Sequence, residues 1–233
     1  MKKIFILLFF VSFNSFGQTA EEYFNRGNNK NYSKDYYGAI ADYTKVIELN
    51  PNYTKAYYNR GLAKYNLKHY YGAIADYTKV IELNPDDAEA YSNRGAAKEE
   101  TFDLAGAISD YNKAIKLNPN YAQPYFNRGI VKKKIDDLKG AISDFTKVIE
   151  LQPDNVKAYL NRGNRKIDLK DYYGAIADYT KIIELQPDNV KVYTNRGIAK
   201  EKIGDMNGAC SDWRKAANLG NTNSKMWVAN SCN

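Results

Sequence analysis

The chain has 233 residues and a formal net charge of +7 at neutral pH. An ordinary globular protein of this length would form one large or two small domains, and a basic chain raises the question of nucleic-acid binding. Beyond residue 17, no stretch is apolar enough to cross a membrane, which excludes a protein with several membrane spans.

The first 17 residues have the three-part pattern of a secretory signal peptide. Lys2 and Lys3 give a positive start, residues 4–13 are almost entirely apolar, and small residues at Ser15 and Gly17 precede a cleavage site before Gln18. The apolar run is short for a bilayer span, although a retained anchor is the alternative. There is no cysteine near the cleavage site, so the sequence does not support a lipoprotein. We therefore expect an exported bacterial protein, periplasmic or secreted.

Residues 18–223 are built from a repeated unit of 34 residues. The tripeptide Asn-Arg-Gly occurs six times at this spacing, with its glycine at Gly27, Gly61, Gly95, Gly129, Gly163 and Gly197. A fixed period of this length indicates stacked copies of one small unit rather than a single globular core. With that glycine placed at position 8, the units are 20–53, 54–87, 88–121, 122–155, 156–189 and 190–223.

Four positions of the unit identify the repeat. Position 8 is Gly, position 20 is Ala, position 24 is aromatic and position 32 is Pro in five units, as at Pro51. The sequence resembles the tetratricopeptide repeat (TPR) family, whose period is 34 residues. Position 7 is Arg where the family usually has Leu, and position 11 is Lys where it usually has Tyr. The resemblance implies an all-α fold, a right-handed α-solenoid of six helix-turn-helix units with a C-terminal capping helix.

The residue pattern supports two antiparallel helices, A and B, in each unit. Apolar residues recur at three- and four-residue steps through the segment 35–49, and an acidic side chain such as Asp35 can cap its start. Pro51 cannot continue that helix. The small Gly and Ala let the two backbones approach, and the aromatic residues at positions 4 and 24 are interpreted as core.

The positive charge comes mainly from the repeat. Position 7 is Arg, position 11 is Lys and position 23 is Asp in every unit, which together give +6. A buried guanidinium needs a partner. We expect each position-7 arginine, for example Arg60, to pair with a position-23 aspartate such as Asp42 or Asp76. The positive charge of the repeat then serves ion pairs within the stack, and no nucleic-acid partner is expected.

The family resemblance places the partner-binding surface on helix A, at positions 2, 5, 6, 9, 12 and 13. Position 6 is always Asn, and its amides either bind a peptide backbone or only complete the packing. Several other positions vary from unit to unit, as expected of a recognition surface. The candidate residues are Phe24, Asn25, Asn28, Tyr58, Asn59, Leu62, Tyr65, Asn93, Phe126, Asn127, Ile130, Asn161, Asn164, Lys191 and Asn195. A carboxylate clamp known in some TPR domains is incomplete here, because Phe24, Glu89 and Asn93 replace its cations.

The C-terminal end departs from the repeat. Gly220 can end the last B helix, and a further helix is expected within 222–233 to cover the open apolar edge. If it folds back about residue 221, Cys210 and Cys232 lie opposite each other. An exported chain with two cysteines permits one disulfide, which we expect between these two.

Three functions remain after this reading. The first is an exported TPR scaffold or adaptor that binds a protein or extended peptide on its concave face. The second is a structural module that self-assembles through its stack ends or joins an envelope complex. The third is cell-wall or carbohydrate binding through tyrosines expected to be exposed, such as Tyr36, Tyr37, Tyr70, Tyr71, Tyr172 and Tyr173. No catalytic constellation, cofactor motif or metal-ligand cluster is found, His69 is the only histidine, and an enzyme is not expected.

Overall fold

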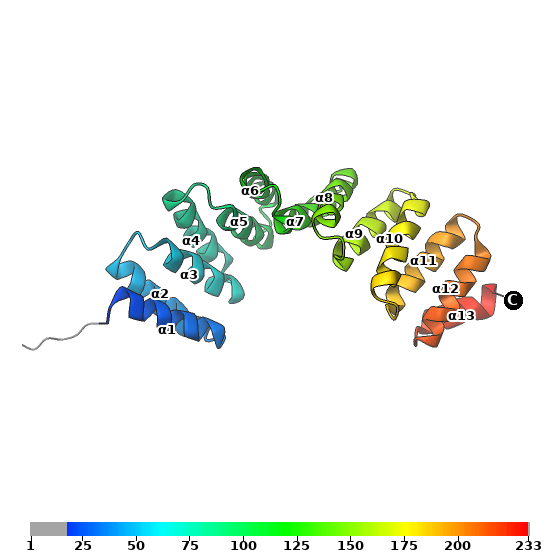
Figure 1. Cartoon of the computed structure of the whole chain (residues 1–233), viewed down its shortest axis with the longest axis horizontal. Helices are drawn as coiled ribbons and strands as arrows, with labels where there is room; N and C mark the ends of the chain where they lie inside the picture. Colours follow the sequence, from blue (N-terminus) through cyan, green and yellow to red (C-terminus); the bar gives the residue numbers. More distant parts are fainter. Residues whose placement is uncertain (1–17, 233) are drawn as a thin grey trace, which may run out of the picture.

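The computed structural model describes residues 18–232, and these residues form helices joined by short turns. Figure 1 shows them stacked in chain order along a curved arch, with α1 at one end and α13 at the other. The signal peptide expected at residues 1–17 lies outside the described residues. The helices are α1 (Ala20–Tyr32), α2 (Tyr36–Leu49), α3 (Thr54–Asn66), α4 (Tyr70–Leu83), α5 (Ala88–Glu100), α6 (Leu104–Leu117), α7 (Ala122–Lys134), α8 (Leu138–Leu151), α9 (Val156–Asp168), α10 (Tyr172–Leu185), α11 (Val190–Lys202), α12 (Met206–Asn218) and α13 (Thr222–Ser231).

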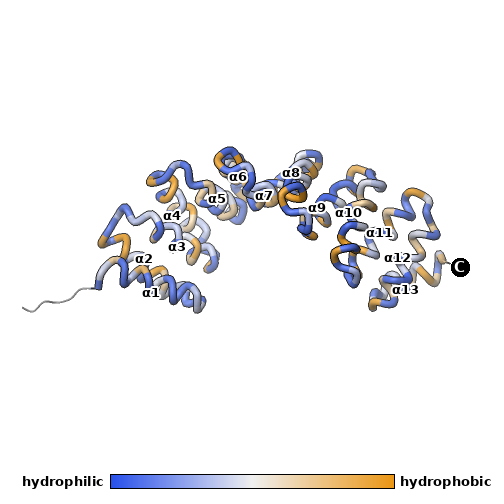
Figure 2. The backbone as a smooth tube through the Cα atoms, viewed as in Figure 1, coloured by the Kyte–Doolittle hydropathy of each residue, from blue (hydrophilic) through white to orange (hydrophobic). Residues whose placement is uncertain are grey.

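Each odd-numbered helix up to α11 is a helix A, and the even-numbered helix after it is its helix B. Every helix packs mainly against its neighbours in the sequence, so contacts between distant units are few. Apolar and polar segments are spread along the whole arch in Figure 2, and the buried apolar residues form several small clusters along the stack. The prediction of an all-α helical-repeat solenoid is confirmed.

Acidic caps fix where the B helices begin. Asp103 lies at the N-cap of α6, and its carboxylate accepts a hydrogen bond of 2.9 Å from the backbone N–H of Gly106. Asp35, Asp137, Asp171 and Asp205 cap their helices in the same way. Such a cap stabilises a helix by about 1 kcal/mol. His69 occupies the equivalent place before α4 without a side-chain cap bond.

The turn between helices A and B contains a feature that the sequence did not reveal. Position 15 has a left-handed backbone in all six units, yet only unit 6 has glycine there, Gly204. The other five residues, with φ between 61° and 64°, are Lys34, Lys68, Phe102, Asp136 and Lys170. A non-glycine residue costs roughly 1–2 kcal/mol in this conformation, so the flanking helices must hold the turn in place.

The aromatic side chains at position 24 fill the centre of each unit. Tyr111 is fully buried, and a Cβ atom added to Gly95 would lie 2.8 Å from its Cε1 atom. The equivalent pairs have the same arrangement in the other units. Glycine at position 8 therefore makes room for an aromatic ring, rather than only for a close approach of two backbones as the sequence suggested.

The tyrosines at position 4 are not core residues in the same sense, which corrects the interpretation from sequence. Tyr57 is only half-buried, and the guanidinium carbon of Arg60 lies 5.5 Å from its ring centroid. The other five units repeat this cation–π contact at 4.8–5.8 Å. These rings support the arginines, and only Tyr193 is buried.

Buried tyrosines predict that the stack loses stability at alkaline pH. Burial raises the pKa of Tyr43 to about 12 and also raises the pKa values of Tyr77, Tyr111 and Tyr179. An unfolded tyrosine ionises near pH 10, so the unfolded state alone releases protons above that pH. This stabilising contribution is complete below about pH 10 and falls as pH rises toward 12, by about 1.4 kcal/mol per group and pH unit.

Urea unfolding between pH 9 and 11.5 measures this loss. Replacing the four tyrosines by phenylalanine, which unit 4 already has at Phe145, should flatten the decline. Both proteins contain the same lysines, so an unchanged slope in the phenylalanine variant would contradict the assignment.

The last helix closes the C-terminal end of the stack. α12 ends before Gly220, whose φ of 101° lets the chain turn back. Cys210 and Cys232 form the disulfide expected from sequence. Trp213 of α12 packs on Trp227 of α13 with ring centroids 5.4 Å apart. In the described part of the chain, no helix has the length and apolarity of a membrane span.

Candidate binding surface

A buried ion cluster holds helix A to helix B in every unit. In unit 3, Arg94 donates through Nε and Nη2 to both oxygens of Asp110, at 2.9 and 2.7 Å, and Lys98 binds the same carboxylate at 2.8 Å. The Asp110 side chain is only 5% exposed. The equivalent clusters are Arg26–Lys30–Asp42, Arg60–Lys64–Asp76, Arg128–Lys132–Asp144, Arg162–Lys166–Asp178 and Arg196–Lys200–Asp212. The predicted arginine–aspartate pairing is confirmed, within the same unit, and the lysine is an additional partner.

Each arginine also bonds outside its own unit, and from unit 2 onward this bond ties its unit to the preceding one. The remaining Nη1 of Arg94 donates to Oγ1 of Thr78 on the preceding helix B at 3.1 Å. The corresponding acceptors of the other arginines are Gln18, Thr44, Asn112, Thr146 and Thr180. The hydrogen bond from Arg26 is the main reason why the pKa of Asp42 is lowered. The repeated positive charges are thus engaged in the scaffold.

The asparagines at position 6 lie on helix A, and several of them bond to neighbouring units. Asn59 donates to Asn28 at 2.9 Å, and the same Asn28 oxygen accepts from the hydroxyl of Tyr43. Asn93 donates to the hydroxyl of Tyr58 at 2.9 Å. Asn25, in contrast, is exposed. Asn28 and Asn59 are therefore bonded to each other across two units.

Two equivalent hollows lie where the start of one helix A meets the next unit. The unit-2 hollow, of about 190 Å³, is lined by Phe24, Thr54, Lys55, Tyr58, Asn59, Val80, Asp87 and Glu89. The unit-4 hollow, of about 390 Å³, is lined by Tyr121, Ala122, Gln123, Phe126, Val148, Gln152, Asn155 and Lys157. In each, an aromatic ring at position 5 and a valine at position 27 give an apolar wall, and polar side chains form the rim.

The aromatic walls rest on the buried core of their own units. Tyr58 packs edge-on against Tyr77 at 5.9 Å, and Phe126 packs edge-on against Phe145 at 5.6 Å between ring centroids. The hydroxyl of Tyr58 donates to Glu89 at 3.2 Å. Burial, followed by the charge of Glu89, raises the pKa of Tyr58. Tyr58 is therefore neutral, with its hydroxyl fixed by a hydrogen bond and its ring fixed by packing.

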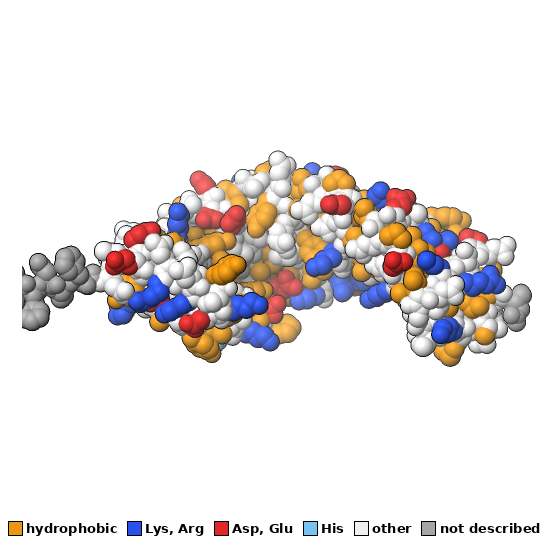
Figure 3. Space-filling view, turned by 60° about the horizontal axis from the view of Figure 1, so that its bottom comes forward, with side chains coloured by type: hydrophobic (Ala, Val, Ile, Leu, Met, Phe, Trp, Pro, Cys, Tyr) orange, Lys and Arg blue, Asp and Glu red, His pale blue; other side chains and the backbone are white. Residues whose placement is uncertain are grey.

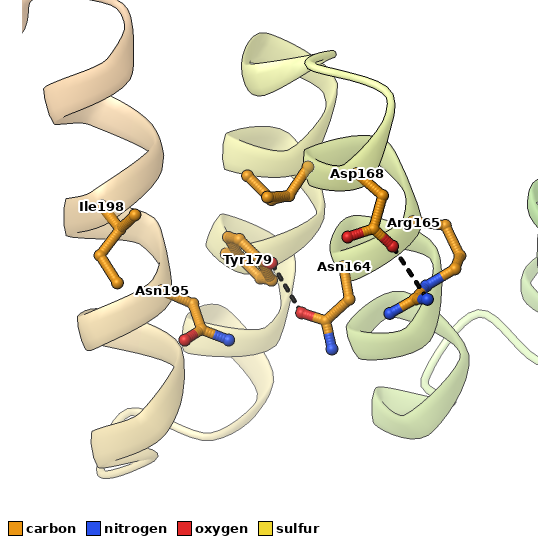
Figure 4. A pocket seen from close by; sticks show the side chains of 7 residues that line it. Asn164, Arg165, Asp168, Tyr179, Asn195 and Ile198 are labelled. Carbon is orange, nitrogen blue, oxygen red and sulfur yellow. Dashed lines mark hydrogen bonds and ion pairs between the residues drawn. The ribbon is translucent and has the colours of Figure 1, made fainter. Parts of the chain in front are cut away.

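Two further hollows are lined mainly by residues from the later turns of A helices. The α3–α5 hollow, of about 410 Å³, is lined by Leu62, Tyr65, Asn66, Tyr77, Asn93, Ala96, Gln123 and Asn127. The α9–α11 hollow, of about 220 Å³, is lined by Asn164, Arg165, Ile167, Asp168, Tyr179, Asn195 and Ile198. Figure 4 shows the second, with the Tyr179 hydroxyl donating to Asn164 at 2.8 Å and Arg165 paired to Asp168 at 2.9 Å.

The hollows on the first four units are neighbours along one surface. Gln123 lines both the α3–α5 and the unit-4 hollow, and the bond between Asn93 and Tyr58 connects the α3–α5 and the unit-2 hollow. Figure 3 brings the open side of the arch forward, and that side is hollowed between its two ends, with lysine and arginine side chains near its border. The hollows therefore form a row in which aromatic and aliphatic walls alternate with polar side chains.

Family models locate the repeat independently. Two models described as a tetratricopeptide repeat match residues 54–87, and 122–155 with 156–189. One described as a TPR repeat matches residues 21–68 and 103–136. Together they cover more than half of the chain. The chain belongs to the TPR family.

Solved TPR proteins have the same fold. The crystal structure of a MamA protein is 25% identical with a TM-score of 0.66, over 76% of this chain and 93% of that one. YrrB, whose structure is described as a TPR protein with an unusual peptide-binding site, is 20% identical with a TM-score of 0.70, over 80% and 97%. PilF from Pseudomonas aeruginosa is 17% identical with a TM-score of 0.72, over 90% and 96%. No curated protein matches the sequence.

The hollows contain many of the candidate TPR residues predicted from sequence. Those that line a hollow are Phe24, Tyr58, Asn59, Leu62, Tyr65, Asn93, Phe126, Asn127, Asn164 and Asn195. Asn28 bonds to Asn59 beside the unit-2 hollow, and Asn161 donates to the backbone oxygen of Lys157. Asn25 and Lys191 are exposed and Ile130 is half-buried, outside these hollows.

Sequence reasoning missed several TPR residues that shape the hollows. Val80 and Val148, from helix B at position 27, form apolar walls, whereas the family resemblance places the surface on helix A. Gln123 and Lys157 lie at position 2, which was recognised as concave but not followed through the units. The described residues hold no group of three or more His, Cys, Asp or Glu side chains placed to bind a metal.

Proposed function

We propose that this TPR protein is a scaffold that binds an extended segment of a partner protein along its concave face. The observation that carries the proposal is the row of hollows on the A helices. Their aromatic and polar linings differ from unit to unit, whereas the ion clusters behind them are the same in all six. An invariant scaffold under a variable surface is what selective recognition of a partner requires.

The solved relatives support the same class of function. YrrB is described as having a peptide-binding site, and its chain is covered almost completely by this fold. The hollows here offer rings as apolar anchors and amides that can bond to a peptide backbone. Gln123 and Asn127, which line the α3–α5 hollow, are amides of this kind.

A double substitution in the two equivalent hollows tests the proposal. Tyr58→Ala with Phe126→Ala removes the aromatic walls, and truncating an anchor of this kind weakens binding by about 2 kcal/mol, or roughly 30-fold. A pull-down from envelope extract with the chain from Gln18 onward should therefore retain a partner that the double variant loses. Isothermal titration with that partner then gives the change in Kd.

The matched control is Tyr71→Ala with Tyr173→Ala, because these tyrosines are 78% and 73% exposed and lie outside the hollows. The control should bind the partner as the unchanged protein does, with circular dichroism showing equal helicity in all three. A partner held equally by the unchanged protein and both variants would contradict the concave site. Loss in the control alone would favour glycan or partner binding by the exposed tyrosines, and a mass that grows with concentration would favour self-assembly.

We also propose that the protein is exported, into the periplasm or beyond the cell. The signal-peptide pattern of residues 1–17 and the Cys210–Cys232 disulfide support this, since disulfides persist in oxidising compartments. Intact mass measured on protein from fractionated cells should correspond to a chain that begins at Gln18. Recovery of the full-length chain from the cytosol, with free thiols, would overturn the proposal.

A further inference from the structure

The unit-2 and unit-4 hollows are two copies of one site. Tyr58 and Phe126 occupy position 5 of their units, and Val80 and Val148 occupy position 27. Six of the eight lining residues of each hollow have a counterpart in the other, two repeats or 68 residues away. Both hollows therefore accept the same kind of group, an apolar side chain placed between an aromatic ring and a valine.

The rims of the two hollows carry opposite charge. Glu89 at the rim of the unit-2 hollow corresponds to Lys157 in the unit-4 hollow, and Asp87 corresponds to Asn155. Lys55 of the first hollow corresponds to the neutral Gln123. Formal charges on the lining residues thus sum to −1 in the unit-2 hollow and +1 in the unit-4 hollow.

Neither of the two exchanged charges is neutralised by an ion pair within residues 18–232. Glu89 is exposed and accepts one hydrogen bond from the Tyr58 hydroxyl, and Lys157 is exposed with its backbone oxygen bonded to Asn161. Charges at the rim of an apolar hollow act over a Debye length of about 8 Å at physiological salt, far enough to reach a residue beside the bound anchor. Each rim can therefore select the charge next to its anchor.

One extended peptide can reach both hollows. From α3 to α7 the stack crosses four helix-to-helix contacts of about 8–10 Å each, which gives at most about 40 Å. An extended chain advances about 3.3 Å per residue, so roughly 12 residues span that distance. The α3–α5 hollow lies between the two sites and leaves room for the intervening residues.

We propose that the unit-2 and unit-4 hollows are paired subsites for one extended segment with two apolar anchors, one flanked by a basic residue and the other by an acidic residue. The basic residue of the segment lies next to Glu89, and the acidic residue of the segment lies next to Lys157. This inference rests on the proposed function and specifies its partner: a segment of mixed charge, rather than a uniformly basic or acidic one.

Selection from a phage-displayed library of random 16-residue peptides tests the charge rule without knowledge of the natural partner. The unchanged protein should enrich peptides with one basic and one acidic residue beside two apolar anchors. Glu89→Lys makes both rims positive and should enrich peptides with two acidic neighbours. Lys157→Glu makes both rims negative and should enrich peptides with two basic neighbours.

Two controls carry the same charge changes elsewhere. Glu82→Lys and Lys139→Glu alter exposed residues that line none of the four hollows, and both variants should keep the preference of the unchanged protein. Synthetic versions of an enriched peptide give the size of the change in affinity. Their two flanking residues are one basic and one acidic, both basic, or both acidic. Fluorescence anisotropy should show the like-charged peptides binding the unchanged protein at least 10-fold more weakly.

The outcomes separate this inference from the proposed function. Enriched peptides without charge preference, whose binding is nevertheless lost in the Tyr58→Ala/Phe126→Ala variant, would overturn the charge rule and leave the concave site intact. Enriched peptides that bind the double variant as well would overturn the concave site itself. An identical preference in Glu89→Lys, Lys157→Glu and the unchanged protein would also overturn the charge rule.

Discussion

Replacing Asp110 with alanine is expected to destabilise the stack by about 3–5 kcal/mol, because it removes one partner from a buried ion cluster and leaves the others. Arg94 and Lys98 both bind this carboxylate, and their side chains are only 16% and 20% exposed. Without it, two partly buried cations face each other in the middle of the stack. Urea unfolding followed by circular dichroism measures the loss.

The control replaces the whole cluster by apolar residues, as Arg94→Met, Lys98→Met and Asp110→Leu together. Buried ion groups replaced by apolar residues of similar volume often leave stability unchanged or raised. The triple variant should therefore be more stable than Asp110→Ala. Equal instability in both would mean that shape, rather than the unpaired charges, decides the result.

The position of the cluster in the stack determines how far the damage spreads. Unit 3 has neighbours on both sides, and units are stabilised mainly by contacts with their neighbours. We therefore expect Asp110→Ala to uncouple the two halves of the arch and broaden the unfolding transition. Asp42 in unit 1 should matter less, since its partner Arg26 is 42% exposed.

The lowered pKa of Asp42 stabilises the fold above about pH 4, and this contribution is lost as pH falls through the folded-state value.

The repeated motifs of the sequence predicted the architecture because each motif makes its contacts within one unit. Asp103 caps the first turn of its own helix, and Arg94 reaches Asp110 only 16 residues later, within one unit. Interactions of this kind recur with the 34-residue period, so the pattern exposes them. The Cys210–Cys232 pair was predictable for the same reason, since the chain needs only one turn to bring the two residues together.

The binding surface was harder to predict because each hollow combines residues from different units. The unit-2 hollow takes Phe24 from unit 1, Tyr58 from unit 2 and Glu89 from unit 3. No local pattern marks such a set, and part of its apolar wall comes from helix B, through Val80. The left-handed conformation at position 15 was not predicted for another reason. Lys34 and Phe102 are not glycines, so the sequence does not mark them, and only the packing of both helices imposes their backbone conformation.

Opening the Cys210–Cys232 disulfide is expected to release α13 from the end of the stack. The bond closes a loop with a sequence separation of 22, for which cross-linking contributes about 3 kcal/mol. α13 has ten residues, too few to stay helical alone, so its order depends on its attachment to α12.

The two tryptophans report on this end alone, because Trp213 and Trp227 pack on each other there and the chain has no others. Reduction, or Cys210→Ser with Cys232→Ser, should shift tryptophan emission to the red as Trp213 loses its cover, while far-ultraviolet circular dichroism changes little. Protease cleavage should then begin between α12 and α13. Unchanged emission and cleavage in the reduced protein would show that apolar contacts of Trp227 and Val228 hold the cap without the bond. The oxidised protein would then owe its closed end to packing, and the disulfide would add only resistance to unfolding from that end.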